Sequence, residues 1–304
     1  MSHRAPEYVP ARPRRSAWRR RQAALRTVLA ALVRRRSGVF GLVVFGLLVV
    51  AGLVSLAWTP FDPEATDVHS AWLLPLHGGH LLGTDRLGHD QFSQLLAGSR
   101  ETLLTAVAAG VLAAVIGLVL ALAAAMTPRR FGAVVVQLID ILIAFPVLLL
   151  AMILAAVYGG STVTAIAAIG VGYGVVVARV ARGEIASVRQ TDYVLAAQAA
   201  GARTGRIVRK HVLPNIAPTL IVQLSLAMAL AVLAEAALTY LGYGTSPSVP
   251  SWGGMLAEQQ AYISARPLLV IWPGLAIAIT VLGLNLLGDA LRDASDPRLR
   301  GEVA

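Results

Sequence analysis

Histidines and aspartates gather in the polar stretch 59–101, which is where a metal site would first be sought. Four imidazoles lie on this stretch: His69, His77, His80 and His89. His89 has Asp85 and Asp90 as near neighbours. A metal needs several ligands brought to one point, as HxxxH or HExxH spacing does on a helix. Neither spacing occurs here, and the chain has no cysteine to supply a thiolate. We therefore expect this chain to bind no metal or other cofactor.

Two carboxylates, Asp140 and Glu235, fall inside long apolar runs. A charge at the centre of a bilayer costs a few kcal/mol, so such residues usually face a cavity or a partner. One interpretation gives them a pore-lining or gate-stabilising role. The other gives each a structural hydrogen bond to a neighbouring helix or to an interfacial arginine. Both lie off-centre in their runs, which favours the structural role and leaves the pore role open.

Motifs for breaking or making bonds are missing from the sequence. There is no GxxxxGK[ST] loop to hold ATP phosphates and no GxSxG nucleophile elbow. No nucleophile–base pair that would suit an intramembrane enzyme is visible. Because the chain also lacks an energy source of its own, we predict a non-catalytic subunit of a larger assembly.

A polar, basic segment, YVLAAQAAGARTGRIVRKHVLPN at 193–215, separates two apolar runs. We predict two short helices around Gly201, which permits a left-handed turn. Thr191 would cap the first helix, which is rich in alanine, and Thr204 would cap the second, which would stop at Pro214. The second helix carries the basic residues Arg206, Arg209, Lys210 and His211. A bare first helix would allow a partner's groove to come close.

The composition indicates an all-α integral membrane protein. Of 304 residues, 57% are hydrophobic and 14% charged, and the mean hydropathy is +0.70. A soluble domain carries about 25% charged residues. Crossing a hydrocarbon core of about 30 Å takes ~20 helical residues. Six segments are long enough to be transmembrane helices: 38–58, 102–126, 133–157, 161–178, 216–242 and 268–288.

Basic residues lie almost entirely on one side of these six spans. Of the 26 Lys and Arg residues, 23 fall in 1–37, in the turn between the second and third spans, in 179–215 and in 292–304. Cytoplasmic loops carry such an excess. We therefore expect both termini and the 179–215 loop to be cytoplasmic, and 59–101 and 243–267 to be extracytoplasmic.

The N-terminal region has a net positive charge that the membrane itself can explain. We expect residues 1–17 to be disordered and 18–36 to form an interfacial amphipathic helix. The apolar run that follows is longer than the core of a signal peptide, so we expect no cleavage. The positive-inside bias accounts for the arginines, so contact with lipid is favoured over nucleic-acid binding.

The 193–215 segment resembles the EAA loop of permease subunits of ATP-binding-cassette (ABC) importers. That family has Glu-Ala-Ala, three further residues, Gly, and then Leu-Pro about a dozen positions on. The corresponding residues here are Leu195, Ala196, Ala197, Gly201, Leu213 and Pro214. Leu195 thus replaces the leading glutamate.

Other stretches are similar to the second permease of dipeptide and oligopeptide importers. They are GTDRLGHDQFSQLLAGSR at 83–100, LIDILIAFPVLLLA at 138–151, VLPN at 212–215, LAEAALTYLGYG at 233–244 and PSWGGMLAE at 250–258. They span most of the chain in the family's order. His89 stands where the family usually has arginine.

This resemblance implies the six-helix, MetI-like permease fold of type I ABC importers. The implied layout is a basic cytoplasmic tail with an interfacial helix (1–37), a first transmembrane helix (38–58), an extracytoplasmic segment (59–101), a five-helix permease core (102–291) that includes the cytoplasmic coupling loop (179–215), and a cytoplasmic tail (292–304). Residues implied to contact the ATPases are Ala196, Ala197, Ala200, Gly201, Arg206, Leu213 and Pro214.

The resemblance also implies partners and a substrate class. The partners would be a different second permease chain, two ATPase subunits that bind ATP and Mg²⁺, and an extracytoplasmic substrate-binding protein. The complex would import short peptides, with nickel, haem and glutathione as alternatives within the same family. A self-contained secondary carrier is the competing class, but it gives little reason for a basic cytoplasmic loop of about 35 residues.

Overall fold

The computed structural model describes residues 32–295. The predicted disorder of 1–17, most of the predicted 18–36 helix and most of the 292–304 tail lie outside the described residues. The predicted all-α fold is confirmed. Its helices are α2 (Arg36–Ala57), α3 (Gln91–Met126), α4 (Arg129–Ile143), α5 (Val147–Tyr158), α6 (Thr162–Arg189), α7 (Asp192–Ala199), α8 (Thr204–Ile207), α9 (Leu213–Tyr240), α10 (Trp252–Gln259) and α11 (Pro267–Ser295). Short 3₁₀ turns occupy Val68–Ser70 and Gln260–Tyr262, and Val208–Val212 forms a π-helical turn.

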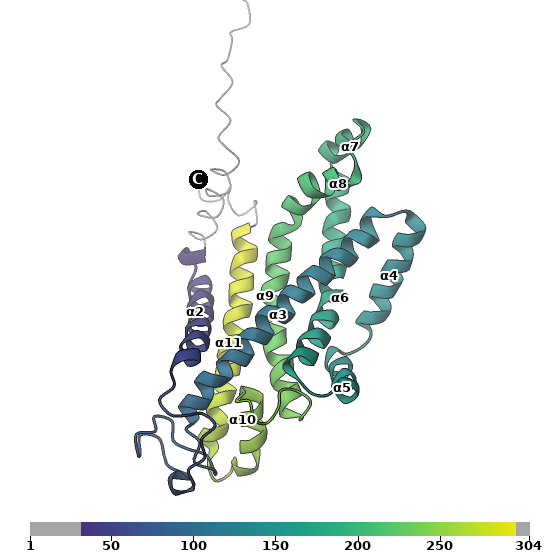
Figure 1. Ribbon diagram of the computed structural model, residues 1–304. Helices are drawn as coiled ribbons and strands as arrows, with labels where there is room; N and C mark the ends of the chain where they lie inside the picture. Colours follow the sequence, from purple (N-terminus) through teal and green to yellow (C-terminus); the bar gives the residue numbers. More distant parts are fainter. Residues whose placement is uncertain (1–31, 296–304) are drawn as a thin grey trace, which may run out of the picture.

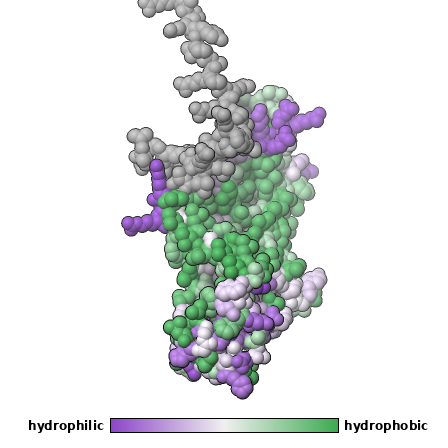
Figure 2. Space-filling model, turned by 60° about the vertical axis from the view of Figure 1, so that its left-hand side comes forward, coloured by the Kyte–Doolittle hydropathy of each residue, from purple (hydrophilic) through white to green (hydrophobic). Residues whose placement is uncertain are grey.

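The long helices run side by side as an elongated bundle (Figure 1). Within the described residues, α2, α3, α6, α9 with its α8 extension, and α11 are each long and apolar enough to cross a membrane. The pair α4 and α5 gives a sixth span if the two are counted together. A broad hydrophobic band lies between more hydrophilic ends (Figure 2). The 59–90 segment and α10 form one end, and α7 and α8 lie at the other (Figure 1).

The third span is not the single helix predicted over 133–157. The chain bends by 85° between α4 and α5. Pro146 lies in this break and caps α5. Proline has no N–H to donate, and it also disfavours helical backbone at the residue before it, here Phe145. The predicted tight connection to the next span is confirmed, because α5 ends at Tyr158 and α6 begins at Thr162.

Several helices extend beyond their predicted spans into the water-facing layers. Asp90 caps α3, accepting a 2.8 Å hydrogen bond from the Ser93 amide, and this helix continues without a break to Met126, although the predicted span began only at 102. Likewise, α6 continues to Arg189, well past the predicted end at 178. Apolar length locates the part of a helix that lies in lipid, but polar turns can prolong the helix at either end.

Small residues bring α3 close to α6 and α9. A Cβ added at Gly117 would lie 2.5 Å from the Val177 side chain on α6. One added at Gly110 would lie 2.6 Å from Met228 on α9. Gly170 would meet Leu112 in the same way. Close approach of this kind is how membrane helices associate, because lipid offers no hydrophobic drive toward association.

Trp252 is buried between α10 and α3, although tryptophan is a residue type common at membrane interfaces. Its side chain is 5% exposed and packs against Gly98 of α3. The indole N–H donates to the Leu95 carbonyl at 3.0 Å. This contact fixes α10 to the N-terminal part of α3, and thereby positions the hydrophilic end of the bundle.

Candidate functional site

The predicted coupling segment, residues 191–214, lies at one tip of the bundle (Figure 1). Its first helix, α7, begins after Thr191 as predicted, although the Thr191 hydroxyl donates to the Val188 carbonyl instead of capping the helix. Gly201 has φ +77°, which confirms the left-handed turn. The amides of Gly201 and Ala202 donate to the carbonyls of Gln198 and Ala197 and close that turn.

Two predicted boundaries of the second helix were wrong. Arg203, not Thr204, occupies the N-cap position of α8, and Thr204 is the first helical residue. Pro214 does not stop the helix either, because 204–240 is one helical unit that continues into the membrane. The π-helical turn before it explains this: the Leu213 amide donates five residues back, to the Val208 carbonyl. The wider turn relieves the clash that proline otherwise makes with the preceding turn.

An apolar cluster holds the coupling segment on the bundle. Val194 of α7 and Val212 of the π-helical turn are fully buried, and Ile207 is nearly so. They pack with Ile185 of α6 and Ala121 of α3. Arg189 adds a hydrogen bond from its guanidinium to the Ala125 carbonyl of α3. The segment is therefore fixed to two spans as well as continuous with a third.

Most of the residues that the family resemblance implies for ATPase contact lie on the outward side of the segment. Five are exposed: Ala196, Ala200, Gly201, Arg206 and Pro214. Ala197 and Leu213 are half-buried, and Leu213 packs on the apolar cluster. No atom lies within 4 Å of a Cβ placed on Gly201. The surface is thus bare around the turn, as the alanines had suggested.

Basic side chains border this bare surface. Arg203, Arg206, Arg209 and Lys210 are exposed. None of them forms a salt bridge with another residue of the described part of the chain. Their charge is therefore available to an acidic partner, and such complementarity sets orientation and association rate more than affinity.

Asp140 lies on α4 and pairs with Arg179 of α6. The distance from the Arg179 guanidinium to the carboxylate is 2.8 Å, and both side chains are about half exposed, at 49% and 50%. A groove of about 1190 Å³ between α4 and α6 is lined by Asp140 together with Arg129, Arg182 and Arg189. Sequence reasoning had not identified Arg179 as the partner. Arg179 directly follows the predicted fourth span, which ends at 178. This position was the sequence signal that could have indicated an interfacial partner for Asp140.

Glu235 lies in the interior between helices, not on a groove. Its side chain is 1% exposed, and Oε1 accepts a 3.0 Å hydrogen bond from the Thr239 hydroxyl one turn on. The other carboxylate oxygen has no partner among the described residues. Neighbouring residues on α9 pack against α3 and α6. The structure therefore does not bring Glu235 and Asp140 into one site.

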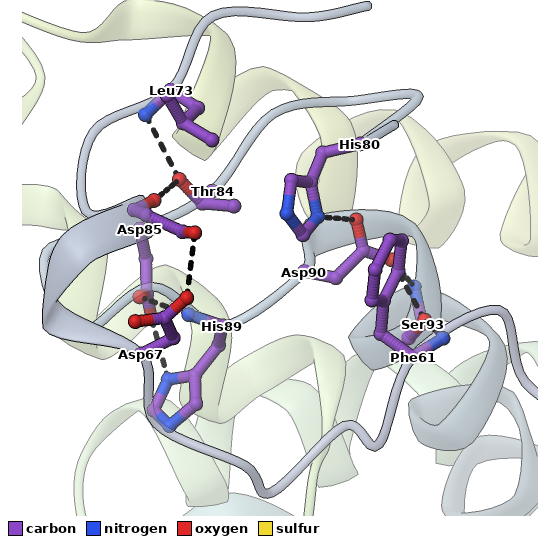
Figure 3. Close-up of polar contacts among 10 residues, drawn as sticks. Phe61, Asp67, Leu73, His80, Thr84, Asp85, His89, Asp90 and Ser93 are labelled. Atoms are coloured by element: carbon purple, nitrogen blue, oxygen red, sulfur yellow. Dashed lines mark hydrogen bonds and ion pairs between the residues drawn. The ribbon is translucent and has the colours of Figure 1, made fainter. Parts of the chain in front are cut away.

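Two histidines of the 59–90 segment, His80 and His89, pair with carboxylates (Figure 3). His80 contacts Asp90 at 2.9 Å, and Asp90 in turn accepts from Ser93, which ties the segment to the start of α3. His89 contacts Asp85 at 2.8 Å. The other Asp85 oxygen accepts from the amides of Leu87 and His89. Within residues 32–295, no three such side chains converge as metal ligands would. These contacts hold the loop in shape.

Residues 113–301 match a protein family described as "Binding-protein-dependent transport system inner membrane component". The match begins within α3 and includes the coupling segment and both membrane carboxylates. The chain belongs to this family. It is accordingly a non-catalytic, multi-pass permease subunit of an ABC importer in the inner membrane, and such importers work with ATPase and binding-protein partners.

Curated relatives extend the similarity to almost the whole chain. The di/tripeptide transport system permease protein DppC of Pseudomonas aeruginosa is 39% identical over 270 residues, covering 86% of this chain and 89% of that protein. The nickel transport system permease protein NikC of Escherichia coli K12 is 35% identical over 263 residues, covering 86% and 95%. Among solved structures, the MetNI methionine ABC transporter matches with a TM-score of 0.56 and 22% identity, over 67% of this chain and 97% of that one. This last likeness supports the MetI-like permease fold.

The left-handed turn at Gly201 gives a direct test of the segment's geometry. Gly201→Ala should strain the turn by about 1–2 kcal/mol, because a Cβ is disfavoured at positive φ. We expect amides of 192–212 to exchange hydrogen about 5–30 times faster. Gly205→Ala is the matched control: it also adds a methyl to open space, but inside α8, where alanine favours helix. Equal exchange in the two variants would contradict a requirement for glycine at 201.

Proposed function

We propose that this chain is one of two different permease subunits of an importer for short peptides, and that residues 191–214 couple it to the ATPases. The observation that carries the proposal is the bare, basic tip formed by α7 and α8, which is rigidly mounted on α3, α6 and α9. An ATPase cleft that closes around this tip would displace three spans together. The family match supports an ATP-driven partner, and the exposed residues supply a surface for it.

The orientation follows from the same feature. The described chain starts and ends at the same end of the bundle as α7 and α8 (Figure 1). The basic segment favours the cytoplasmic side for that tip, and we propose cytoplasmic termini on this ground. The opposite end, with the 59–90 segment and α10, would then face the extracytoplasmic binding protein.

Short peptides are the proposed substrates on the strength of the relatives. The di/tripeptide permease has the higher identity, 39% against 35% for the nickel permease, at equal coverage of this chain. Nickel import is the second candidate, because the match covers 95% of the nickel permease's own length. In both cases the binding protein would contribute most of the selectivity, and this chain the path.

Of the two membrane carboxylates, we propose that Asp140 has the gating role. It lines the α4–α6 groove and holds α4 to α6 through Arg179, beside the break at Pro146. Glu235 is enclosed by helices, so we assign it the structural role of a hydrogen-bonded interior group. A charge pair that is half exposed contributes little stability, which leaves it free to open and close.

Coupling is tested by Gly201→Asp, which adds bulk and negative charge to the bare surface. We expect an affinity-tagged Gly201→Asp chain to co-purify with the second permease from detergent-solubilised membranes, but to recover much less ATPase and to lose transport. Gly159→Asp is the matched control, with φ +86° and equally open space in the α5–α6 turn. Normal transport by Gly201→Asp, or recovery of the wild-type chain without any ATPase, would refute the coupling assignment.

The substrate class is tested with the complete complex and its binding protein in proteoliposomes. We expect di- and tripeptides to stimulate ATP hydrolysis and to accumulate inside the vesicles, because loaded binding protein should favour ATPase closure. Free Ni²⁺ should do neither. Stimulation by Ni²⁺ but not by peptides would replace peptide import with nickel import and leave the coupling assignment intact.

The gating role of Asp140 is tested by Asp140→Asn in the same vesicles. Removing the charge should change the unfolding free energy by less than about 1 kcal/mol, since the pair with Arg179 is half exposed. We expect the transport rate per ATP hydrolysed to fall. The exchanged pair, Asp140→Arg with Arg179→Asp, should recover part of it. Unchanged coupling in Asp140→Asn would show that the pair is only structural.

A further inference from the structure

A short hairpin, residues 73–84, exposes apolar side chains at the hydrophilic end of the bundle. Its turn is closed by the Leu76 amide, which donates to the His80 carbonyl at 2.8 Å. Three leucines of the hairpin are at least half exposed: Leu74 at 52%, Leu76 at 79% and Leu81 at 50%. Single exposed leucines are ordinary, but three within one short hairpin make an apolar surface of the kind that marks a contact site.

Polar contacts fix the hairpin to the start of α3 (Figure 3). The His80 side chain is buried and pairs at 2.9 Å with Asp90, the residue that caps α3. The Thr84 hydroxyl accepts from the Leu73 amide at 2.9 Å and donates to the carbonyl of Ser70. The exposed leucines are therefore carried on a braced support, not on a free loop.

The backbone at Leu76 is strained. Its φ of +67° lies in the left-handed region, which leucine rarely adopts because its Cβ crowds the following carbonyl. Since the side chain is largely exposed, packing within the described residues does little to offset this strain. Strained residues persist where surrounding contacts impose them, and they gather at sites that hold a ligand or a partner. The strain therefore agrees with an external partner for this side chain.

The hairpin lies at the level where the chain leaves α2. The last turn of α2 exposes Leu56, and Trp58, directly after the helix, is 59% exposed. Tryptophan is typical of the membrane–water interface. Only three residues later, the Phe61 ring stacks on the His80 imidazole, with the ring centroids 4.2 Å apart. This contact places the hairpin beside the end of a membrane span.

Leu82 of the hairpin reaches the apolar surface of the spans themselves. It lines a groove of about 270 Å³ whose other walls come from α2, α3 and α11. Leu47 of α2 and Ile279 of α11 line the same groove, and both are exposed side chains within membrane-crossing helices. The apolar surface of the hairpin is thus continuous with the exposed apolar surface of the bundle.

We propose that the 73–84 hairpin inserts Leu74, Leu76 and Leu81 into the interfacial layer of the bilayer, so that its partner is lipid. Apolar side chains are stable at this boundary, where acyl chains meet headgroups. The residues between the leucines, 77–79, are a histidine and two glycines, all exposed. Irregular backbone does not enter lipid-exposed hydrocarbon, so these residues favour shallow insertion over deep insertion.

Insertion would hold the start of α3 at a fixed depth. His80 and Asp90 join the hairpin to that helix, and the opposite end of α3 lies under the predicted coupling segment. The lipid contact would therefore give the transporter a stationary end. The proposal rests on neither the peptide substrate nor the coupling assignment, because it uses only contacts at this end of the bundle.

The depth of the hairpin is tested by spin labelling. Because the chain has no cysteine, Leu76→Cys provides a single labelling site in the full chain, purified with its associated subunits in lipid nanodiscs. We expect the nitroxide to collide more with molecular oxygen, which dissolves in lipid, than with water-soluble chromium oxalate. Leu56→Cys, on the exposed face of α2, is the reference for lipid, and Glu64→Cys, an exposed position in the same segment, is the reference for water.

Three results of that experiment would overturn the proposal. Chromium oxalate access at Leu76→Cys equal to that at Glu64→Cys would place the hairpin in water. Shielding from both reagents would show that another subunit covers it. Chromium oxalate access that is lost on addition of the binding protein would assign the surface to that protein.

The contribution of the leucine itself is tested by Leu76→Asn, because asparagine adopts left-handed backbone more readily and should preserve the turn. With the label at Leu81→Cys, we expect Leu76→Asn to lower the oxygen accessibility and to raise that of chromium oxalate. Val68→Asn is the matched control, since Val68 is a 76% exposed apolar residue of the same segment outside the hairpin. Equal accessibilities at Leu81→Cys in the two variants would contradict insertion of Leu76.

Discussion

The close packing of α3 against α6 and α9 is the interaction on which the rest of the structure depends. In hydrocarbon, burying apolar side chains gains little, so helices associate where small residues let their backbones approach. Gly117 and Gly110 on α3 provide two such positions, each with a side chain of the facing helix within 2.6 Å of where a Cβ would lie. Because α3 runs from Gln91 to Met126, this packing joins the two ends of the molecule.

Each end of α3 supports one of the candidate sites. At its start, Asp90 caps the helix and pairs with His80. One turn further on, Trp252 of α10 donates a hydrogen bond to the Leu95 carbonyl and so fixes α10 to the same end of α3. At its far end, Ala121 belongs to the cluster under α7 and α8. The 59–90 segment at one end and the predicted coupling segment at the other therefore share a rigid element.

Patterns within one segment of the sequence predicted those features of the fold that depend on that segment alone. Apolar length located the five helices that could cross a membrane, and the glycine at 201 correctly indicated a left-handed turn, but the third predicted span is broken between α4 and α5. The burial of Trp252 could not be predicted, because tryptophan suits both a lipid interface and a buried contact, and only the position of Gly98 decides between them. The pairing of Asp140 with Arg179 and the enclosure of Glu235 likewise depend on how helices are rotated about their axes. Residue spacing along one helix does not determine that rotation.

The two prolines that sequence reasoning misjudged show how the same residue can separate or join two helices. At Pro146 no compensating turn exists, and α4 and α5 diverge by 85°. Before Pro214, the π-helical turn, closed by the Leu213 amide donating to the Val208 carbonyl, leaves room for the proline ring, and the helix continues to Tyr240. A displacement of α8 would therefore be passed on to α9, whereas α4 has no such continuous connection to α5. In the proposed coupling, the tip would act directly on α9 and α6, and the broken span between α3 and α6 would be the place where the bundle can yield.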